Sequence, residues 1–476
     1  MSVLNSTVPS VAAGRFNLWM VRGFVTILGL YVLYMNLLSP FNPDELEGVH
    51  SAWLILQGKL IYVDFFQHHH PLLYSYLVPI ITLLGEHAGT VIACRIAIMP
   101  FFAGILAASY LLALRLFDKP TALVAIACLL LSWPFLYAAT SIRPDVPQVM
   151  FGMIALLMLY PRRAPQGGKP PHVSMWRYLL AGLCLGLSFL FLQKAIFYVA
   201  VVTLVLLGRI LRREAGWKVL FTMAGGMVIA IFPFAIWLAA HGMTGEYFFL
   251  NWTLNAYCHD RFSFVSFAIV VLESQPVMCA FALLAFIALV RDRRHAELTV
   301  MLMGLLCQVL LAPSPYLHYW LPVLPLLAIY AGHGLMRTLG PRPAIIGGLL
   351  AASLIAPIIT NICAAYVVGG LTNLERLDQI AYVLKVTSPS DTACDPYVIF
   401  NVFRKDVDYF WFSLDDKHML ATYKRLRPYE LDIYDRIDKM KPKAVSTFGI
   451  ENLDDARIRD HYVKSDRFPT ILIRNR

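Results

Sequence analysis

Long apolar runs follow one another along most of the chain, separated by short polar segments. Each run is about long enough for a helix that crosses a bilayer, which takes about 20 residues. From this pattern we predict an all-α polytopic membrane domain of about 11 transmembrane helices plus interfacial helices. The predicted spans are Gly23–Leu38, Ile92–Leu116, Thr121–Ala139, Val146–Tyr160, Tyr178–Leu192, Ala195–Gly208, Val219–Ala239, Phe264–Val290, Leu298–Ala312, Tyr319–Met336 and Ala344–Val368.

The apolar run Pro71–Leu84 decides the predicted topology. It has only about 14 residues and contains two prolines and two tyrosines, so we expect it to lie in the interface. Most Lys and Arg of the short loops then fall on one side, which the positive-inside rule makes cytoplasmic. If the run crossed, every later loop would change sides and the bias would largely invert. We therefore predict a cytoplasmic amino terminus and an extracytoplasmic carboxyl terminus, in a bacterial inner (plasma) membrane.

From about Leu371 the composition becomes that of a soluble domain. Hydrophobic patterning predicts strands and helices there. The strands are expected at Tyr397–Phe403, Ala444–Ile450 and Thr470–Ile473, and the helices at Leu374–Lys385 and Tyr429–Met440. We therefore divide the chain into a transmembrane domain at 1–370, whose outer loop 39–91 carries interfacial helices, and a small extracytoplasmic α/β domain at 371–476. The second domain has no nucleotide-binding glycine loop and no metal-ligand spacing, so we assign it no chemistry.

Composition agrees with a membrane protein. Hydrophobic residues make up 58% of the chain and charged residues 15%, against about 25% charged in soluble domains. The net charge of +10 then reflects basic cytoplasmic loops rather than a nucleic-acid partner. Arg15 and Arg22 precede a first span without a small-residue cleavage site, so we expect a retained anchor. Cys258 and Cys394 fall in segments expected to be exposed, where an oxidising compartment would allow them to pair.

The outer loop after the first span is the richest in polar residues. Asn42, Pro43, Asp44 and Glu45 form the pattern of a helix start, with Asn as N-cap, Pro first and acids in the first turn. The apolar stripe that follows suits a helix on the membrane surface. The two acids either complement the helix dipole or take part in a reaction. A carboxylate at the end of a span is well placed as a general base for an acceptor hydroxyl or amine.

Three adjacent histidines, His68, His69 and His70, stand near the end of the same loop. Adjacent residues of a regular helix or strand cannot all face one metal, and no HxxxH or HExxH pattern accompanies them. Contact with a phosphate or sugar and plain interfacial solvation explain them better. The sequence leaves a divalent-metal requirement open and indicates no other cofactor.

Isolated charges lie at the outer ends of other spans. Arg143 and Asp145 flank a tight connection, where they either pair with each other or line the same cavity as Asp44. Lys194 and Arg95 either bind a carboxylate or phosphate, or extend to the interface. Later outer segments add polar residues whose spacing singles out none of them, namely Glu246, Asn255, His259, Asp260, Arg261, Tyr316 and His318.

The order of these motifs resembles the GT-C glycosyltransferases, in particular the protein O-mannosyltransferase and lipid A aminoarabinose transferase type. The resemblance rests on Asp44-Glu45 at the start of the first outer loop, the histidines before Pro71-Leu-Leu-Tyr74, and Arg143-Pro-Asp145 in the second outer loop. It implies a GT-C-like fold and transfer of a sugar from a polyprenyl-phosphate-linked donor to a protein, lipid or glycan acceptor, with membrane lipids around the enzyme.

The resemblance also implies roles for individual residues. The family's acid at the start of the first outer loop falls on Asp44, beside Glu45, and is expected to activate the acceptor. The family's second outer-loop acid falls on Asp145. Where the family often has a lysine near the donor phosphate this chain has His69, and a neutral imidazole brings no fixed charge. The predicted site has Asp44, Glu45 and Asp145 as catalytic residues, and His68, His69, His70, Arg95, Arg143 and Lys194 as substrate-binding residues, with no metal ligands assigned.

Two other classes of protein explain part of the pattern. A lipid-linked-sugar transporter or flippase needs charges near mid-membrane, discontinuous helices and an internal repeat. The sequence shows no obvious halves, and its polar residues cluster on one side of the membrane. A non-catalytic anchoring protein would account for the C-terminal domain but not for Asp44, Asp145 and Lys194 at interfaces. The predicted function is therefore a membrane glycosyltransferase.

Overall fold

The computed structural model describes residues 11–161, 173–258, 263–290, 292, 295–312, 316–340, 342–368, 370–412 and 419–475. Helices make up the part before residue 370. They are α1 (Val11–Leu37), α2 (Pro43–Leu56), α3 (Leu72–Leu84), α4 (Ala88–Leu116), α5 (Lys119–Leu130), α6 (Trp133–Ala139), α7 (Asp145–Met158), α8 (Met175–Phe191), α9 (Ile196–Leu211), α10 (Lys218–Ala240), α11 (Thr244–Phe248), α12 (Asn255–Tyr257), α13 (Phe264–Ser274), α14 (Pro276–Leu289), α15 (Ala296–Leu310), α16 (Leu324–Leu339), α17 (Pro343–Ser353) and α18 (Ile355–Val368). Two 3-10 turns (Gln193–Ala195 and Leu317–Trp320) and a π-helical turn (Phe249–Leu254) join them.

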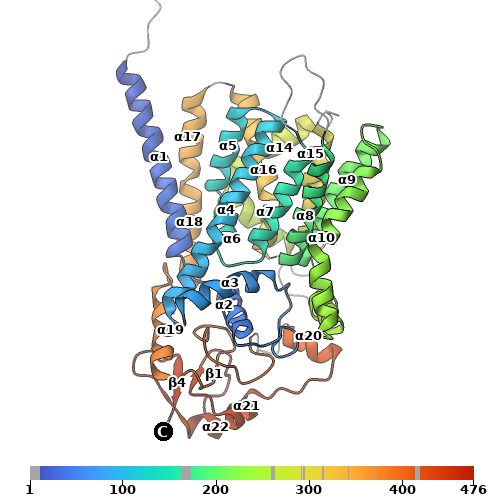
Figure 1. Cartoon of the computed structure of the whole chain (residues 1–476). Coiled ribbons are helices and arrows are strands. Elements are labelled where there is room, and N and C mark those ends of the chain that lie inside the picture. Colours follow the sequence, from blue (N-terminus) through green and yellow to red (C-terminus); the bar gives the residue numbers. More distant parts are fainter. Residues whose placement is uncertain are drawn as a thin grey trace, which may run out of the picture.

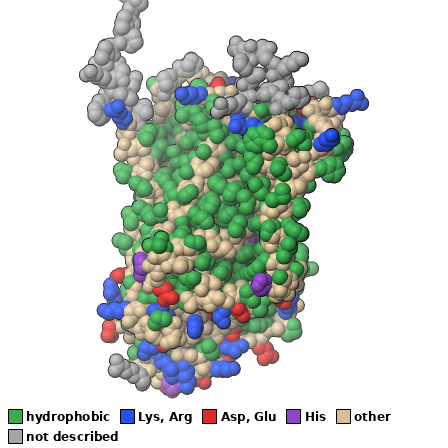
Figure 2. Space-filling view, in the orientation of Figure 1, with side chains coloured by type: hydrophobic (Ala, Val, Ile, Leu, Met, Phe, Trp, Pro, Cys, Tyr) green, Lys and Arg blue, Asp and Glu red, His purple; other side chains and the backbone are tan. Residues whose placement is uncertain are grey.

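Most of these helices run side by side in a bundle, with the start of α1 and the C-terminus at opposite ends of the molecule (Figure 1). Hydrophobic side chains cover the middle of the bundle and charged side chains lie near its two ends (Figure 2). By length and composition, four described helices can cross a membrane, or six if each of two bent pairs counts as one span. The other apolar helices of the described chain are shorter, so the count of about eleven spans stays a prediction.

Two predicted spans are bent rather than straight. Thr121–Ala139 is the pair α5 and α6, bent by 74°, and Phe264–Val290 is the pair α13 and α14, bent by 104°. Each second helix has a proline at its start, Pro134 in α6 and Pro276 in α14. Proline has no N–H for the preceding turn and disfavours helical backbone in the residue before it, so both breaks fall at these positions.

The C-terminal segment combines short helices with a small mixed sheet. Its elements are α19 (Leu374–Val386), β1 (Ala393–Cys394), α20 (Met419–Leu426), α21 (Ile433–Met440), β2 (Ala444–Ser446), α22 (Ala456–Arg459), β3 (Tyr462–Lys464) and β4 (Ile471–Arg474). The strand order is β1-β2-β4-β3. Strand β1 pairs with β2 in parallel, and the other neighbours are antiparallel, with Val445 opposite Leu472.

The predicted strand at Tyr397–Phe403 is wrong. This stretch is a loop whose apolar side chains, such as Phe400 and Phe403, are buried. Its backbone is held by Asp395, which accepts hydrogen bonds from the N–H groups of Phe400 and Asn401 at 2.6 and 2.9 Å. The buried Asp395 carboxylate therefore accepts the backbone hydrogen bonds that a neighbouring strand would accept in a sheet.

The apolar stripe of α2 predicts a helix on the membrane surface, and this prediction is wrong. The helix is instead buried between other segments of the protein. Residues Glu45–Leu54 are all buried. Helix α3 packs against α2, and the C-terminal segment lies below both helices in Figure 1. His50 of α2 reaches that segment, with Nδ1 2.9 Å from the Val402 carbonyl oxygen and Nε2 2.8 Å from Asp406 Oδ2. The apolar stripe therefore packs against other segments of the same chain.

No disulfide joins any two of the eight cysteines, all of which lie in the described part of the chain. Cys258 and Cys394 are buried, so the expectation that they are exposed is wrong and they do not pair with each other.

Candidate active site

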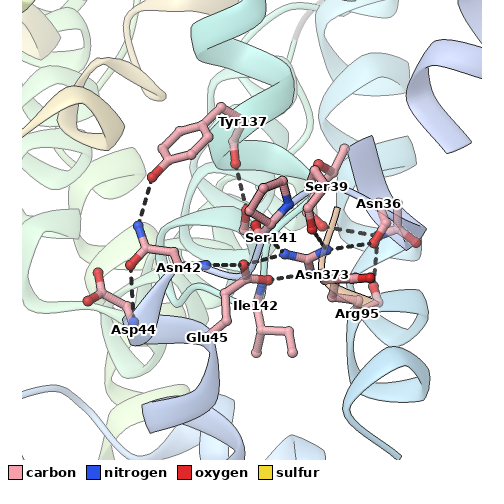
Figure 3. Close-up of polar contacts among 12 residues, drawn as sticks. Asn36, Ser39, Asn42, Asp44, Glu45, Arg95, Tyr137, Ser141, Ile142 and Asn373 are labelled. Atoms are coloured by element: carbon pink, nitrogen blue, oxygen red, sulfur yellow. Dashed lines mark hydrogen bonds and ion pairs between the residues drawn. The ribbon is translucent and has the colours of Figure 1, made fainter. Parts of the chain in front are cut away.

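The start of α2 is held by a buried ion pair between Glu45 and Arg95 of α4 (Figure 3). Arg95 Nε and Nη2 donate to the two Glu45 carboxylate oxygens at 2.7 and 2.6 Å, and both side chains are 1% exposed. Glu45 also accepts from the backbone N–H groups of Asn42 and Ile142, each at 3.0 Å. Arg95 donates further to the carbonyl oxygens of residues 36, 39 and 40. Each partner is surrounded by groups of opposite polarity, as a buried charge requires.

This pair fixes the backbone that carries the neighbouring charged residues. Asn42 and Glu45 bracket Asp44, and Ile142 directly precedes Arg143. In Figure 3 Glu45 turns toward Arg95, whereas Asp44 points to the other side of the helix start. The adjacent acids Asp44 and Glu45 therefore have different surroundings, and Glu45 and Arg95 hold the site in place rather than face it.

A cavity of about 910 Å³ lies at this end of the bundle. Its polar wall includes Asp44 and Glu47 of α2, residues of the following loop, residues at the start of α7, and the 3-10 turn Gln193–Ala195 before α9. The lining residues with ionisable groups are Asp44, Glu47, His68, His69, Arg143, Asp145, Lys194, Tyr137, Tyr316, His318, Tyr319, Tyr397 and Cys258. The remaining wall is largely apolar and includes residues of α6, α13 and α18.

Four charges of alternating sign form a row along this cavity. Asp44 Oδ2 accepts from Arg143 Nη1 at 2.5 Å. Asp145 lies between two cations, with Oδ2 3.5 Å from Arg143 Nε and Oδ1 3.8 Å from Lys194 Nζ. These two distances are longer than hydrogen bonds, so the ammonium group of Lys194 keeps donors for a ligand. Lys194 Nζ also lies 3.2 Å above the centre of the Tyr319 ring.

The two ends of the row differ in exposure. The Asp44 side chain is 48% exposed, and its Oδ1 has no hydrogen bond among the described residues. Lys194 and Asp145 are buried or nearly so. The accessible carboxylate at one end of the row suits a proton acceptor. The shielded cation at the other end suits an anion-binding site.

Gln67 organises the wall beside Asp44. Its Nε2 donates to Glu47 Oε1 at 2.9 Å, and its Oε1 accepts from the backbone N–H groups of His68 and His69. Burial, together with the negative charge of Asp44, raises the pKa of Glu47 to about 8. Burial lowers the pKa of His68 to about 4 and that of His69 well below its usual value. Both imidazoles are therefore neutral at pH 7, and the fixed positive charges of this wall are Arg143 and Lys194.

The structure brings together six of the nine residues predicted for the site. They are Asp44, Asp145, Arg143, Lys194, His68 and His69. Glu45 and Arg95 form the buried pair instead. His70 turns away, because its two ring nitrogens face the Phe189 carbonyl oxygen and the Tyr247 hydroxyl. Of the later outer residues, His318 and Asn255 line the cavity, whereas His259, Asp260 and Arg261 lie outside the described residues.

Sequence reasoning missed Glu47. It lies three residues after Asp44, which places both acids on one face of α2, and that spacing is a signal the sequence does contain. Among the residues that the structure describes, no group of three or more His, Cys, Asp or Glu side chains is arranged to hold a metal ion.

The chain is similar to known glycosyltransferases. The family model of the dolichyl-phosphate-mannose-protein mannosyltransferases matches residues 69–237. ArnT from Cupriavidus metallidurans bound to undecaprenyl phosphate superposes with a TM-score of 0.56 at 18% identity, over 76% of this chain and 69% of that chain. Its apo state gives 0.54 at 18% identity, over 79% and 70%. The Archaeoglobus fulgidus oligosaccharyltransferase tethered with an acceptor peptide gives 0.48 at 13% identity, over 90% and 69%. No curated protein sequence matches significantly.

The likeness to ArnT shows a shared fold. Together with the family match, it confirms the resemblance to the GT-C glycosyltransferases that the outer-loop motifs predict. The chain is an integral membrane protein of the GT-C glycosyltransferase fold, and its polar cavity lies where Asp44, Arg143, Asp145 and Lys194 converge.

Proposed function

We propose that this protein is a membrane glycosyltransferase that moves a sugar from a polyprenyl-phosphate-linked donor to an acceptor on the extracytoplasmic face. The observation that carries the proposal is the row of charges from exposed Asp44 to shielded Lys194 along one cavity. The relatives' names add support, since one binds undecaprenyl phosphate and the matching family is named for a dolichyl-phosphate-linked sugar.

The row fits the charges of the reaction. The acceptor hydroxyl or amine gives its proton to Asp44 while its lone pair forms a bond to the anomeric carbon. The bond from that carbon to the phosphate oxygen breaks, and the electron pair leaves with the lipid phosphate. Arg143 and Lys194 stabilise the negative charge that develops there. A single displacement of this kind inverts the anomeric carbon and needs no covalent intermediate on the protein.

The surroundings of the cavity suit a lipid-linked donor. The apolar residues Trp133, Phe267 and Ala364 come from helices of the bundle and line the cavity beside its charged wall. A polyprenyl tail partitions into such surroundings while its phosphate stays near the cations. His68 and His69, neutral at pH 7, offer hydrogen bonds to the phosphate or sugar but no fixed charge.

Asp44→Asn tests the proposal directly. The variant is expected to lose transfer by at least about 100-fold, because general base catalysis contributes roughly 10²–10⁴-fold. Transfer is measured in proteoliposomes with a radiolabelled polyprenyl-phosphate sugar and cell-envelope acceptors. Asp64→Asn is the matched control, since Asp64 is an exposed acid of the same loop that lies outside the cavity lining. Full transfer by Asp44→Asn with normal folding would contradict the assignment of the base.

A lipid-linked-sugar transporter or flippase is the second candidate, favoured by the two bent helix pairs. It predicts that lipid-linked sugar changes leaflet without any bond breaking. A wild-type protein that moves the intact donor across vesicles and never releases lipid phosphate would support the transporter instead.

A further inference from the structure

Glu47 has one carboxyl oxygen that no described residue binds, and this oxygen is open to the cavity. Glu47 is 7% exposed and lines the cavity. Its Oε1 accepts a hydrogen bond from Gln67 Nε2 at 2.9 Å, whereas its Oε2 has no hydrogen bond to the described residues. Oε2 is not among the unpaired polar atoms that the described protein seals off from solvent. Glu47 therefore meets a molecule in the cavity through Oε2.

The surroundings of Glu47 favour its neutral, protonated form. Among the described residues Glu47 has no ion-pair partner, because the Arg143 guanidinium faces Asp44 and Asp145 instead. The charged and titratable groups that interact with Glu47 are Asp44 of the same helix, Arg143 before α7 and Tyr74 of α3. A buried carboxyl beside a second carboxylate, without a cation of its own, keeps its proton, in agreement with the raised pKa of Glu47.

The amide of Gln67 decides which oxygen of Glu47 carries this proton. Gln67 Oε1 accepts from the backbone N–H groups of His68 and His69 at 2.7 and 3.2 Å, so the other atom of its amide is the NH₂ group. An NH₂ group only donates, so Glu47 Oε1 is the accepting carbonyl oxygen and Oε2 bears the acidic hydrogen. The hydroxyl of the neutral acid is thus the part of Glu47 that is open to the cavity.

We infer that Glu47 is a substrate-binding residue that donates a hydrogen bond from Oε2 to a hydroxyl oxygen of the molecule bound beside Asp44. The inference rests on the proposed function, in which Asp44 takes the proton of the acceptor and the cations hold the phosphate. Glu47 lies three residues after Asp44, on the same face of α2, and therefore at the Asp44 end of the row of charges. Its partner then belongs to the sugar or to the acceptor, since the phosphate lies with Arg143 and Lys194.

The test uses the full-length protein in proteoliposomes. The donor is undecaprenyl phosphate carrying radiolabelled mannose, glucose or arabinose, and the acceptor is a cell-envelope extract. Glu47→Met removes the donated hydrogen bond and is expected to raise one KM by about tenfold, which corresponds to about 1.4 kcal/mol. A higher KM for the donor assigns the hydroxyl to the sugar, and a higher KM for the extract assigns it to the acceptor. The Kd for undecaprenyl phosphate without a sugar is expected to stay within about twofold.

Glu47→Gln separates a neutral donor from a structural role. Its amide keeps an acceptor for Gln67 and places an NH₂ donor where Oε2 lies, so at pH 6.5 the affected KM is expected within about threefold of the wild type. As pH rises to 9.5 the wild-type acid ionises and loses its hydrogen, whereas the amide does not. The ratio of the Glu47→Gln KM to the wild-type KM is therefore expected to fall about tenfold. Other titrating groups are common to both proteins and cancel in this ratio.

Ser51→Ala is the matched control. Ser51 is a buried residue of the same helix, and its Oγ also accepts from Gln67 Nε2, at 3.0 Å, but it does not line the cavity. Its replacement disturbs the same amide and leaves Glu47 Oε2 in place, so neither KM is expected to change by more than about twofold. Thermal unfolding checks that each variant folds. If Glu47→Met fails to accumulate, the pH dependence of Glu47→Gln decides the inference.

Three results would overturn the role of Glu47 while leaving the proposed function intact. The first is an unchanged KM for both substrates in Glu47→Met. The second is a weakened affinity for undecaprenyl phosphate alone, which would assign Glu47 to the phosphate. The third is a ratio of KM values between Glu47→Gln and wild type that stays constant from pH 6.5 to 9.5. A wild type that transfers no sugar from any of the three donors would refute the proposed function itself, and this inference with it.

Discussion

Replacing Glu45 and Arg95 tests whether this buried pair holds the site in place or takes part in catalysis. Replacing Glu45 with Met leaves the Arg95 guanidinium buried without its counter-charge, at a cost of about 3–5 kcal/mol in the free energy of unfolding. The N–H groups of Asn42 and Ile142 also lose their acceptor, and each adds about 1 kcal/mol or more. The expected loss of about 5–7 kcal/mol is comparable with the whole stability of many domains, which is about 5–15 kcal/mol.

A double-mutant cycle tests this origin of the loss. Glu45→Met and Arg95→Met are each expected to destabilise strongly. The combined variant removes both charges and is expected to recover at least about 2 kcal/mol relative to the sum of the single changes. Stability is measured by thermal and denaturant unfolding in detergent. Glu430→Met, at an exposed acid of the C-terminal segment, serves as the control and is expected to stay within about 0.5 kcal/mol of the wild type.

Transfer activity decides between the two roles of Glu45. If Glu45 only positions Asp44 and Arg143, activity per folded molecule recovers in part in the double variant. A Glu45→Met protein that is as stable as the wild type yet has no transfer activity would refute this reasoning and make Glu45 a catalytic residue.

Three further predictions follow from the cavity and its surroundings. Lys194→Met is expected to raise the Kd for undecaprenyl phosphate about 10- to 100-fold, because a charged hydrogen-bond donor is lost. The exposed control Lys59→Met is expected to leave this Kd unchanged. Equal affinities of the two variants in a direct binding assay would contradict the prediction. Burial raises the pKa of Glu47 to about 8 in the folded protein, so Glu47 stays protonated there while it ionises in the unfolded chain. The contribution of Glu47 to the free energy of unfolding is therefore lost as pH rises from about 4.5 to about 8. Glu47→Gln lacks this dependence and should gain about 1–3 kcal/mol relative to the wild type between pH 5 and pH 8, and a flat difference between the two unfolding curves would speak against a buried, protonated Glu47. His50→Ala removes the partner of Asp406 Oδ2 and of the Val402 carbonyl oxygen, so the C-terminal segment should loosen by about 1–3 kcal/mol. Limited proteolysis should then cut this segment faster than in the exposed control His241→Ala, and equal cutting rates would show that His50 does not hold it.

Much of the local structure follows from the sequence because it depends on neighbours along the chain. The helix start at Asn42 is confirmed, with Asn42 as N-cap and Pro43 first, since a cap needs only residues within one turn. The helix at Leu374–Lys385 is confirmed as α19, and the apolar runs of the bundle are helices at nearly the predicted positions. The bends at Pro134 and Pro276 were also within reach of the sequence, since proline acts on its own turn.

What the sequence by itself determined is a membrane protein with a family's order of outer-loop motifs. Only the tertiary structure decided which of two adjacent acids faces the cavity. That choice depends on Arg95 and Arg143, which lie 50 and 99 positions away along the chain from Glu45 and Asp44 respectively. Periodicity reports which side of a helix is apolar, but burial and pairing of charges are set by contacts between distant segments.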